Sequence, residues 1–587
     1  MESTGDAVSQ TAYQVTVARS EDDLQKGNLV WDSKKTAGSL SVGIAYAGKK
    51  LEPSTRYFWK VTAWDQDDKP VKSRKPAWFE TSADSTAWKT AQWIGSDKPH
   101  FSAYRARYII DFDADLAKPL SEFIFGYTEP GNYCSILISR RAGEALMTVK
   151  YMRDSASTIF FTRAFGIKDT TRAHVNMTVG NIQYPSEYVL GISVDSSERT
   201  QAIVPGWFVN ETGNDTLGKA VIDSLTSSSG SAEMFSGCRL YGIGVKAVSN
   251  VKIANDAWGV TLFDQNKDKT EWKDSPIGVK LAFPTKDVSA PMLRREFKVD
   301  KGVASARLYV TARGFYDFTI NGRPVSADYF NPGWTDYRCR IMFNTFDVTD
   351  LLANGGNVMG CMLGSGWYTD AMSFNTNRED QYGAYPQLLC HLLIRFKDGT
   401  KLCIDSDKEW KVYNGGPYEE DSWLNGVFYN SAKEIAGWDK PKFNASAWKP
   451  VQLFGTHPDS ITLQPYVGEP VLETMRIVAS DVTEPAPHVY VYDFGQNLVG
   501  IPSVRIFGKK GQRVTLKFAE MTYPDIIPTD PVAPYTKEMY ESKKGLAYVD
   551  NLRGALATDI YICRGDEKGE VFEPKFTSHG FRYIQIE

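Results

Sequence analysis

Long apolar runs and clusters of positive charge are missing from this 587-residue chain. No stretch approaches the roughly 18 apolar residues that a membrane span needs, so no span is expected. The N-terminal residues, MESTGDAVSQTAYQV, have no basic region followed by an apolar one, so no secretory leader is visible. Either the protein is cytoplasmic or a leader lies outside this chain. The second interpretation is preferred because the chain begins just inside a domain, and it predicts a periplasmic or secreted protein.

Basic runs are also scarce. The formal net charge is −4 and no Lys/Arg cluster stands out, which argues against nucleic acid as a partner.

Motifs for metal and nucleophilic chemistry are absent as well. The seven cysteines are odd in number and form no CxxC pair, so a structural zinc site is not expected and buried free thiols are. The six histidines form no HxH or HExxH pattern, and no GxSxG elbow or P-loop occurs.

Acidic pairs do occur, as a hydrolase of glycosides would need. They lie at Glu419-Glu420-Asp421, Arg378-Glu379-Asp380 and Asp67-Asp68. All three lie in polar, turn-like contexts, so we expect solvated carboxylates and predict no catalytic residue in this chain.

The composition favours many short strands. Aromatic residues make up 13 % of the chain, and Gly and Pro number 47 and 28. Such a profile is typical of β-sandwiches, and the length is too great for a single core. The predicted fold class is therefore all-β, with tandem β-sandwich or jelly-roll domains.

The most informative stretch runs from Leu308 to Tyr368. Asn321-Gly322 separates two strand-like runs and predicts a hairpin. Two aromatic clusters follow, Trp334-Thr335-Asp336-Tyr337 and Gly366-Trp367-Tyr368. Aromatic rings beside carboxylates on sandwich loops suit sugar binding, because a ring packs on the apolar face of a pyranose while Asp or Asn takes its hydroxyls.

The same stretch resembles the N-terminal β-sandwich of bacterial α-L-rhamnosidases, glycoside hydrolase family 78, in INGRPV, NPGWTDY, FDVTDLL and GNVMGCMLGSGWY. The resemblance continues through VYDFGQNLVG, RVTLKFAEM and FTSHGFRYIQIE. It implies a module that binds rhamnose with help from Ca²⁺, and a helical (α/α)6 catalytic barrel that would follow Glu587.

With this resemblance, four domains are expected. The family would pass almost directly from the first domain to the third, so the segment between them is predicted to be an insertion, with a structural role preferred over a sugar site. The four are a fibronectin-III-like sandwich at 1–85, a laminin-G/concanavalin-like inserted jelly roll at 96–288, a rhamnosidase N-terminal carbohydrate-binding-like sandwich at 289–460, and a rhamnosidase-type accessory sandwich at 461–587.

Candidate sugar-contacting residues come from the two aromatic clusters and the polar segment after them. Core or loop packing is the alternative role for each of them. Asp336 and Asp380 are also the candidate Ca²⁺ ligands. The full candidate set is Trp334, Asp336, Tyr337, Trp367, Tyr368, Asp380 and Tyr382.

Three positions depart from the family pattern. Val427 stands where the family has Glu, Asn430 where it has Asp, and Lys433 where it has Arg. Any ligand or domain contact made by those family residues is therefore in question here. His579, in the SHGFRY motif, is predicted to make a structural hydrogen bond near a domain junction.

The resulting functional hypothesis is a non-catalytic portion of an α-L-rhamnosidase-like hydrolase. The parent would release terminal rhamnose with inversion, and this portion would bind a rhamnose-containing glycan or glycoside and support the barrel. The alternatives are a stand-alone carbohydrate-binding or adhesion protein and a structural scaffold that binds nothing.

Overall fold

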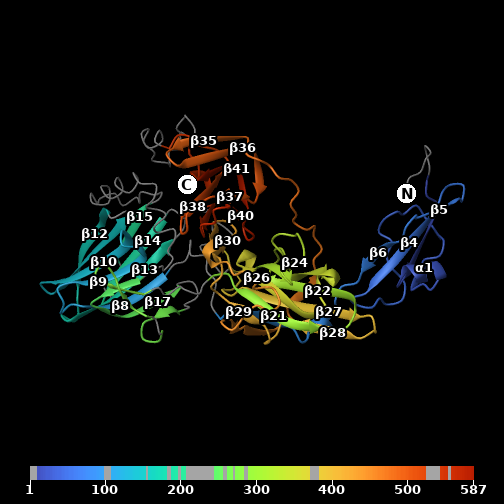
Figure 1. Ribbon diagram of the computed structural model, residues 1–587, viewed down its shortest axis with the longest axis horizontal. Helices are drawn as coiled ribbons and strands as arrows, with labels where there is room; N and C mark the ends of the chain where they lie inside the picture. Colours follow the sequence, from blue (N-terminus) through green and yellow to red (C-terminus); the bar gives the residue numbers. More distant parts are fainter. Residues whose placement is uncertain are drawn as a thin grey trace.

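A computed structural model describes most of the chain, and the rest is left undescribed. The described residues are 9–97, 108–153, 156–181, 187–195, 200–205, 243–255, 261–268, 271–282, 289–370, 382–523, 543–552 and 557–587. Figure 1 shows separate β-rich bodies along the chain, which confirms the predicted all-β class. No helix among the described residues is long and apolar enough to span a membrane.

The N-terminal body is one hydrogen-bonded sheet around a small core of Val15, Val17 and Tyr57. Its strands β1 and β4 carry β-branched and aromatic residues and form the central pair. The elements are β1 (Ala12–Ala18), α1 (Glu21–Lys26), β2 (Trp31–Asp32), β3 (Thr36–Ala37), β4 (Arg56–Trp64), β5 (Pro70–Lys72), β6 (Ala77–Glu80) and η1 (Ser85–Trp88).

The second body is a sandwich of two antiparallel sheets, as predicted for the 96–288 segment. One sheet has β9 (Ser121–Glu129), β10 (Asn132–Arg141), β11 (Glu144–Arg153), β12 (Ala156–Gly166), β16 (Ile243–Lys246), β19 (Lys273–Asp274) and β20 (Lys280–Ala282). The other has β8 (Tyr108–Asp115), β13 (Arg172–Asn181), β14 (Glu187–Val194), β15 (Thr200–Pro205), β17 (Val248–Asn255) and β18 (Thr261–Asp264).

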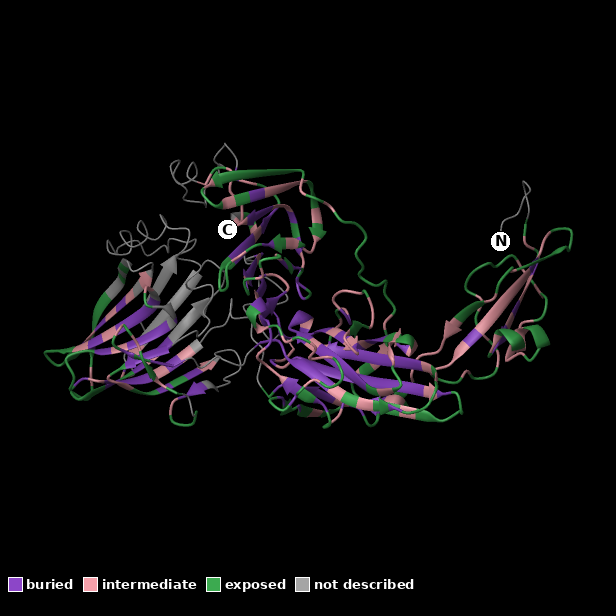
Figure 2. Cartoon of the chain, viewed as in Figure 1, coloured by how far each residue is buried: buried purple, intermediate pink, exposed green. Residues whose placement is uncertain are grey.

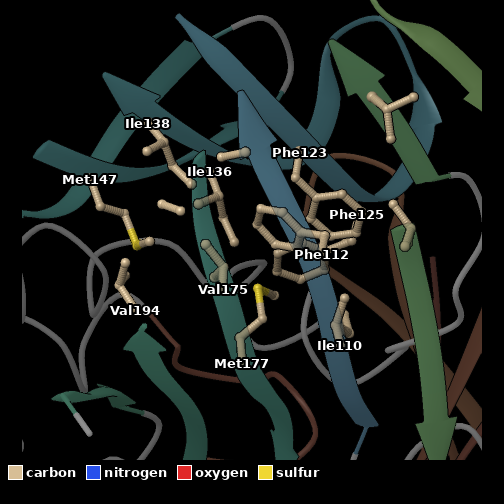
Figure 3. Close-up of a cluster of buried hydrophobic side chains, with 14 of the residues drawn as sticks. Ile110, Phe112, Phe123, Phe125, Ile136, Ile138, Met147, Val175, Met177 and Val194 are labelled. Carbon is tan, nitrogen blue, oxygen red and sulfur yellow. The ribbon is translucent and has the colours of Figure 1, made fainter. Parts of the chain in front are cut away.

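Alternation along these strands builds the core of the second body. Ile110, Phe112 and Ala114 of β8 are buried, and the Phe112 and Phe123 rings stack with centroids 4.7 Å apart. Figure 3 shows Ile110, Phe112 and Phe123, with Ile136 of β10, directed into the space between the sheets. Strand period 2 therefore places one apolar face of each sheet against the other.

The central sandwich also has two sheets, and Figure 2 shows buried strands running through it. One sheet has β21 (Met292–Val299), β23 (Phe315–Ile320), β24 (Arg323–Pro324), β26 (Gly355–Gly364), β29 (Lys411–Tyr413) and β32 (Lys449–Pro450). The other has β7 (Gln92–Gly95), β22 (Val303–Arg313), β25 (Arg340–Asp347), β27 (Gln387–Phe396), β28 (Lys401–Asp405), β33 (Gln452–Thr456) and β34 (Thr462–Pro465). Two short helices, η2 (Thr349–Leu351) and α4 (Gly366–Thr369), lie in its connections.

The predicted hairpin at Asn321-Gly322 is confirmed. Both residues have positive φ, 54° and 75°, and they join β23 to β24. This is the left-handed backbone that a type I′ turn requires.

The C-terminal body has one seven-stranded sheet and one two-stranded sheet. The large sheet has β30 (Tyr418–Ser422), β31 (Gly426–Asn430), β35 (Asp481–Ala486), β36 (Val489–Gly500), β38 (Arg513–Ala519), β39 (Thr558–Ile562) and β41 (His579–Ile586). The small one pairs β37 (Val504–Ile506) with β40 (Glu570–Phe572), and η3 (Ser431–Lys433) and η4 (Asp550–Leu552) complete the body.

The strand pairing divides the last two bodies differently from the predicted boundary at 460. β31 pairs in parallel with β39, so residues 418–430 belong to the C-terminal sheet. The chain then returns to the central sandwich, where β34 pairs with β25, before it enters β35. Such long-range pairing leaves no local sequence signal, and the chain passes between the two bodies three times.

The prediction of buried free thiols holds for part of the cysteine set. Cys134, Cys361, Cys390 and Cys563 are buried thiols outside any disulfide. It is wrong for two positions, because Cys339 and Cys403 are free but exposed.

An ion network connects the N-terminal body to the central sandwich. The Arg307 guanidinium lies 2.6 and 2.9 Å from the two carboxylate oxygens of Glu80 and 2.9 Å from Asp347. Arg56 joins both carboxylates at 3.2 and 3.5 Å. Because Arg307 and Glu80 are nearly buried, the bidentate contact is little screened by water.

Replacing Glu80 with glutamine is expected to loosen this connection by about 1–2 kcal/mol. The cost is less than that of breaking an isolated buried pair, because Asp347 still faces Arg307. Small-angle scattering should show a larger radius of gyration for Glu80→Gln. Glu52→Gln is the control, because Glu52 pairs with Arg19 on the exposed surface of the same body. An unchanged scattering curve for Glu80→Gln would contradict the proposed role of this ion network in holding the two bodies together.

Candidate functional site

Two of the predicted rings meet in a column of aromatic side chains at one end of the central sandwich. Trp334 and Trp367 stack with centroids 5.8 Å apart and planes at 28°. Trp367 lies 4.7 Å from Trp423, which in turn lies 4.6 Å from Phe330. Phe315 packs within 6 Å of the last three rings. The column is therefore a packed unit with one ring, Trp334, at its outer end.

Trp334 is the predicted ring that remains open to solvent. Its side chain is 58 % exposed, whereas Tyr337 and Tyr368 are 3 % and 8 % exposed. Gly333, with φ 85°, makes the turn just before Trp334. Because Trp367 covers one face of the Trp334 indole, the exposed part is a supported flat surface rather than a free side chain.

Tyr337, Tyr368 and Tyr382 form a separate aromatic cluster. The Tyr337 ring lies 5.2 Å from Tyr368 and 5.1 Å from Tyr382. Burial raises the pKa of the Tyr337 phenol well above its ordinary value. The prediction that Tyr337 or Tyr368 contacts sugar directly is therefore wrong, because both rings are buried. Both pack in the core, which was the alternative role. Tyr382 is half-buried and also receives Arg338 over its ring at 5.6 Å.

Asp336 is occupied by its neighbour Arg338. The guanidinium Nε and Nη2 donate to the two carboxylate oxygens at 2.9 Å each, and the Arg338 backbone N–H donates at 3.1 Å. These hydrogen bonds hold the pKa of Asp336 below its usual value. Asp380, the other candidate, lies outside the described residues.

The arrangement at Asp336 does not fit a calcium ligand. Calcium takes six to eight oxygen ligands and needs carboxylate oxygens free to coordinate it. Both Asp336 oxygens face a guanidinium, and no group of three or more His, Cys, Asp or Glu suited to a metal exists within the described ranges.

Two buried carboxylates position the aromatic column, and sequence reasoning missed both roles. Asp421 accepts a hydrogen bond from the backbone N–H of Ser365, where α4 begins. Asp370, where α4 ends, accepts from the backbone N–H of Trp423 at 2.6 Å. These exchanges join the α4 turn that carries Trp367 to the β30–β31 turn that carries Trp423.

The expectation that the Glu419-Glu420-Asp421 run is solvated is wrong for its last two members. Glu420 and Asp421 are 3 % and 0 % exposed. They lie on β30, whose pairing with β31 places them at the junction of the two sandwiches. The polar run resembles a surface turn, and only the long-range pairing buries it.

The three departures from the family pattern have structural roles. Val427 is fully buried in the core of the C-terminal body. The Asn430 amide donates to Glu419 at 2.9 Å, and Lys433 pairs with the same carboxylate at 2.9 Å.

The predicted structural hydrogen bond of His579 is confirmed. Its Nε2 lies 3.2 Å from Asp559, both side chains are buried, and the same carboxylate oxygen accepts from the Val427 backbone N–H.

A cleft of about 1160 Å³ opens on the inner side of the aromatic column. Trp423, Phe330 and Phe494 line it together with the crossing segment from Val471 to Ala479. Four of its charged lining residues are paired, since Asp317 meets Lys575 at 2.7 Å and Arg476 meets Glu473 at 2.8 Å, and most of the other lining residues are apolar. The cleft therefore presents mainly apolar surface.

Comparison with known protein families places rhamnosidase domains in this chain. Residues 1–84 match the Rha78A-like N-terminal immunoglobulin domain. Residues 301–474 match the Alpha-L-rhamnosidase N-terminal domain, and residues 483–587 match the bacterial alpha-L-rhamnosidase concanavalin-like domain.

Relatives extend this similarity over the whole length of the chain. The Alpha-L-rhamnosidase of Streptomyces avermitilis is 32 % identical over 609 residues, covering 98 % of this chain and 52 % of the relative. That of an Alteromonas species is 31 % identical over 58 % of this chain and 37 % of the relative. The chain thus spans about half the length of the first relative and a smaller share of the second. The first alignment covers nearly all of this chain and so extends into the 96–288 segment, whereas the second covers 58 % of the chain.

Solved structures agree with the fold. The Streptomyces avermitilis alpha-L-rhamnosidase, solved in complex with L-rhamnose, aligns over 100 % of this chain and 53 % of its own, with 26 % identity and a TM-score of 0.57. The alpha-L-rhamnosidase from Dictyoglumus thermophilum has 23 % identity and a TM-score of 0.60, covering 100 % of this chain and 44 % of its own. The second likeness concerns the fold alone.

Proposed function

We propose that this chain is the non-catalytic portion of an α-L-rhamnosidase-type glycoside hydrolase and that it binds carbohydrate through Trp334. The observation that carries the binding role is the open face of Trp334, backed by Trp367 at 5.8 Å. The similarity to α-L-rhamnosidases along the chain supports a rhamnose-containing glycan or glycoside as the ligand. The parent would hydrolyse terminal α-L-rhamnose with inversion, in the periplasm or outside the cell.

A rigid indole suits a deoxy sugar for a physical reason. The C–H-rich face of a pyranose and its methyl group lose unfavourable hydration when they cover an aromatic ring. Because the Trp334 ring is already held by Trp367, little side-chain entropy is lost on binding. One ring gives modest affinity, and we expect a Kd on the order of 1 mM, or about 4 kcal/mol.

The second role we propose is support of a catalytic domain by the C-terminal body and the crossing segment before it. This part of the surface carries many exposed apolar side chains, and such patches on soluble proteins are often interaction sites. A covering domain would remove them from water, and the relatives contain about as much chain again as this one. The residues are Val467, Val471, Leu472, Met475, Val478, Val482, Val499, Phe507 and Val571.

Replacing Trp334 with alanine is expected to weaken L-rhamnose binding at least tenfold, because the sugar loses the most exposed ring of the column. Intrinsic tryptophan fluorescence during a rhamnose titration measures this. Trp78→Ala is the matched control, since Trp78 is 57 % exposed but lies on the N-terminal body. Equal affinity in both variants would contradict the assignment to Trp334.

A further inference from the structure

A second pocket lies where the central sandwich meets the C-terminal body, away from the aromatic column. Its volume is about 540 Å³, within the roughly 300–1,000 Å³ usual for small-molecule sites. Met362 and Trp438 line it from the central sandwich, and Lys510 and Arg564 from the C-terminal body. We call it the junction pocket.

Its aromatic walls are held in place by neighbouring groups. The Trp438 ring stacks on Trp448 with centroids 5.9 Å apart, and its backbone carbonyl accepts from Arg294 Nε at 2.9 Å. The Tyr429 ring stacks on Tyr561 at 5.7 Å with planes 7° apart. The pocket therefore offers fixed rings rather than mobile ones.

Its polar groups converge on Glu434. The Tyr429 hydroxyl donates to one carboxylate oxygen at 2.9 Å, and the Arg564 guanidinium pairs with the other. Arg564 also lies 3.7 Å from Asp566, so two carboxylates face its single positive charge. This hydrogen-bonded pair has the chemistry to receive sugar hydroxyls, because it combines strong donors with a strong acceptor.

Lys510 differs from the other charged groups of the junction pocket. Among the described residues, no carboxylate forms an ion pair with its ammonium group. Lys510 is exposed, and Glu434 and Asp566 both face Arg564, so Lys510 is a cation of the junction pocket with no ion-pair partner among the described residues. An anionic group on a ligand would complete the pairing.

We propose that the junction pocket binds an acidic sugar, a monosaccharide or sugar residue that carries a carboxylate. The sugar ring would lie against Trp438, its hydroxyls would meet Glu434 and Arg564, and its carboxylate would pair with Lys510. This site is separate from Trp334 and does not depend on rhamnose binding there.

The test is a calorimetric titration of the whole chain with sodium D-galacturonate and, separately, with D-galactose, which differs at the carboxylate carbon. We expect galacturonate to bind at least tenfold more tightly than galactose. Lys510→Gln should remove this preference, and 0.5 M NaCl should weaken it. Lys509→Gln is the matched control, because Lys509 is adjacent and exposed but does not line the pocket.

Three results would overturn the proposal. They are equal binding of the two sugars, equal losses in Lys509→Gln and Lys510→Gln, and absence of any saturable binding. Galacturonate binding should persist in Trp334→Ala, so a failure at the Trp334 surface and a failure at the junction pocket are distinguishable.

Discussion

Replacing Glu570 with glutamine is expected to destabilise the C-terminal body by about 3 kcal/mol at neutral pH. The carboxylate is fully buried and lies at the start of β40. Five donors point at it, at 2.7–3.1 Å: Ser431 Oγ, Tyr561 OH and the backbone N–H groups of Arg564, Gly565 and Asp566. A glutamine amide keeps one acceptor oxygen and replaces the other with a donor, so buried donors would face a donor.

The pH dependence of this effect has a definite sign. Burial alone would raise the pKa of Glu570, but the hydrogen bonds it accepts lower it from 4.5 to about 2. A lowered pKa in the folded state means that the stabilisation is full above pH 4.5 and is lost as the pH falls toward 2. A shift of this size corresponds to about 3 kcal/mol.

Thermal unfolding at pH 7 and pH 3 measures both parts of the prediction. At pH 7 the transition of the C-terminal body should fall by roughly 10 °C in Glu570→Gln. At pH 3 the gap between the two proteins should narrow. Glu567→Gln serves as the control, because Glu567 is exposed in the same loop. A gap that stays constant with pH would show that the carboxylate charge is not what stabilises the loop.

The central sandwich should become less stable as the pH rises above neutral, because His391 then loses its proton. Its Nδ1 lies 2.6 Å from Asp405, and the ring is 6 % exposed between Tyr309 and Trp88. Burial alone would lower the pKa of His391. Hydrogen bonds to Asp405 and Cys403 and the Asp405 charge outweigh burial and raise it from 6.5 to about 9.

A raised pKa in the folded state gives a stabilisation that is full below pH 6.5 and lost as the pH rises through 9. The loss amounts to about 3 kcal/mol between pH 6 and pH 10. We expect the melting temperature of the central sandwich to fall over this range and Asp405→Asn to remove most of that fall. His488→Gln should leave it unchanged, because His488 is exposed. A pH profile identical in wild type and Asp405→Asn would refute this role for the pair.

Local patterns predicted the parts of the fold that local physics decides. The hairpin at Asn321-Gly322 follows from two residues that tolerate positive φ, and it formed as expected. Alternating apolar residues predicted the sandwich cores, because strand period 2 alone separates the two faces. Trp334 and Trp367, candidates from two separate turn-bounded segments, stack on each other, and their contact with sugar stays a prediction.

Pairing between strands far apart in the sequence determined the features that local patterns did not predict. The parallel pairing of β31 with β39 buries Glu420 and Asp421, which a polar run on its own does not indicate. Tyr337 follows exposed Trp334 by three residues and Tyr368 comes directly after Trp367, but both tyrosines pack inward against Tyr382. Exposure of a ring depends on which face of its turn is covered by distant parts of the chain, and the neighbouring sequence does not predict this.

The measurement that tests the central claim most directly is calorimetric titration of the whole chain with L-rhamnose, with calcium and with a chelator. We predict saturable millimolar binding that disappears in Trp334→Ala and, because Arg338 occupies Asp336, persists in the chelator. No saturable heat at tens of millimolar sugar would contradict the carbohydrate-binding role and leave the chain as a structural scaffold.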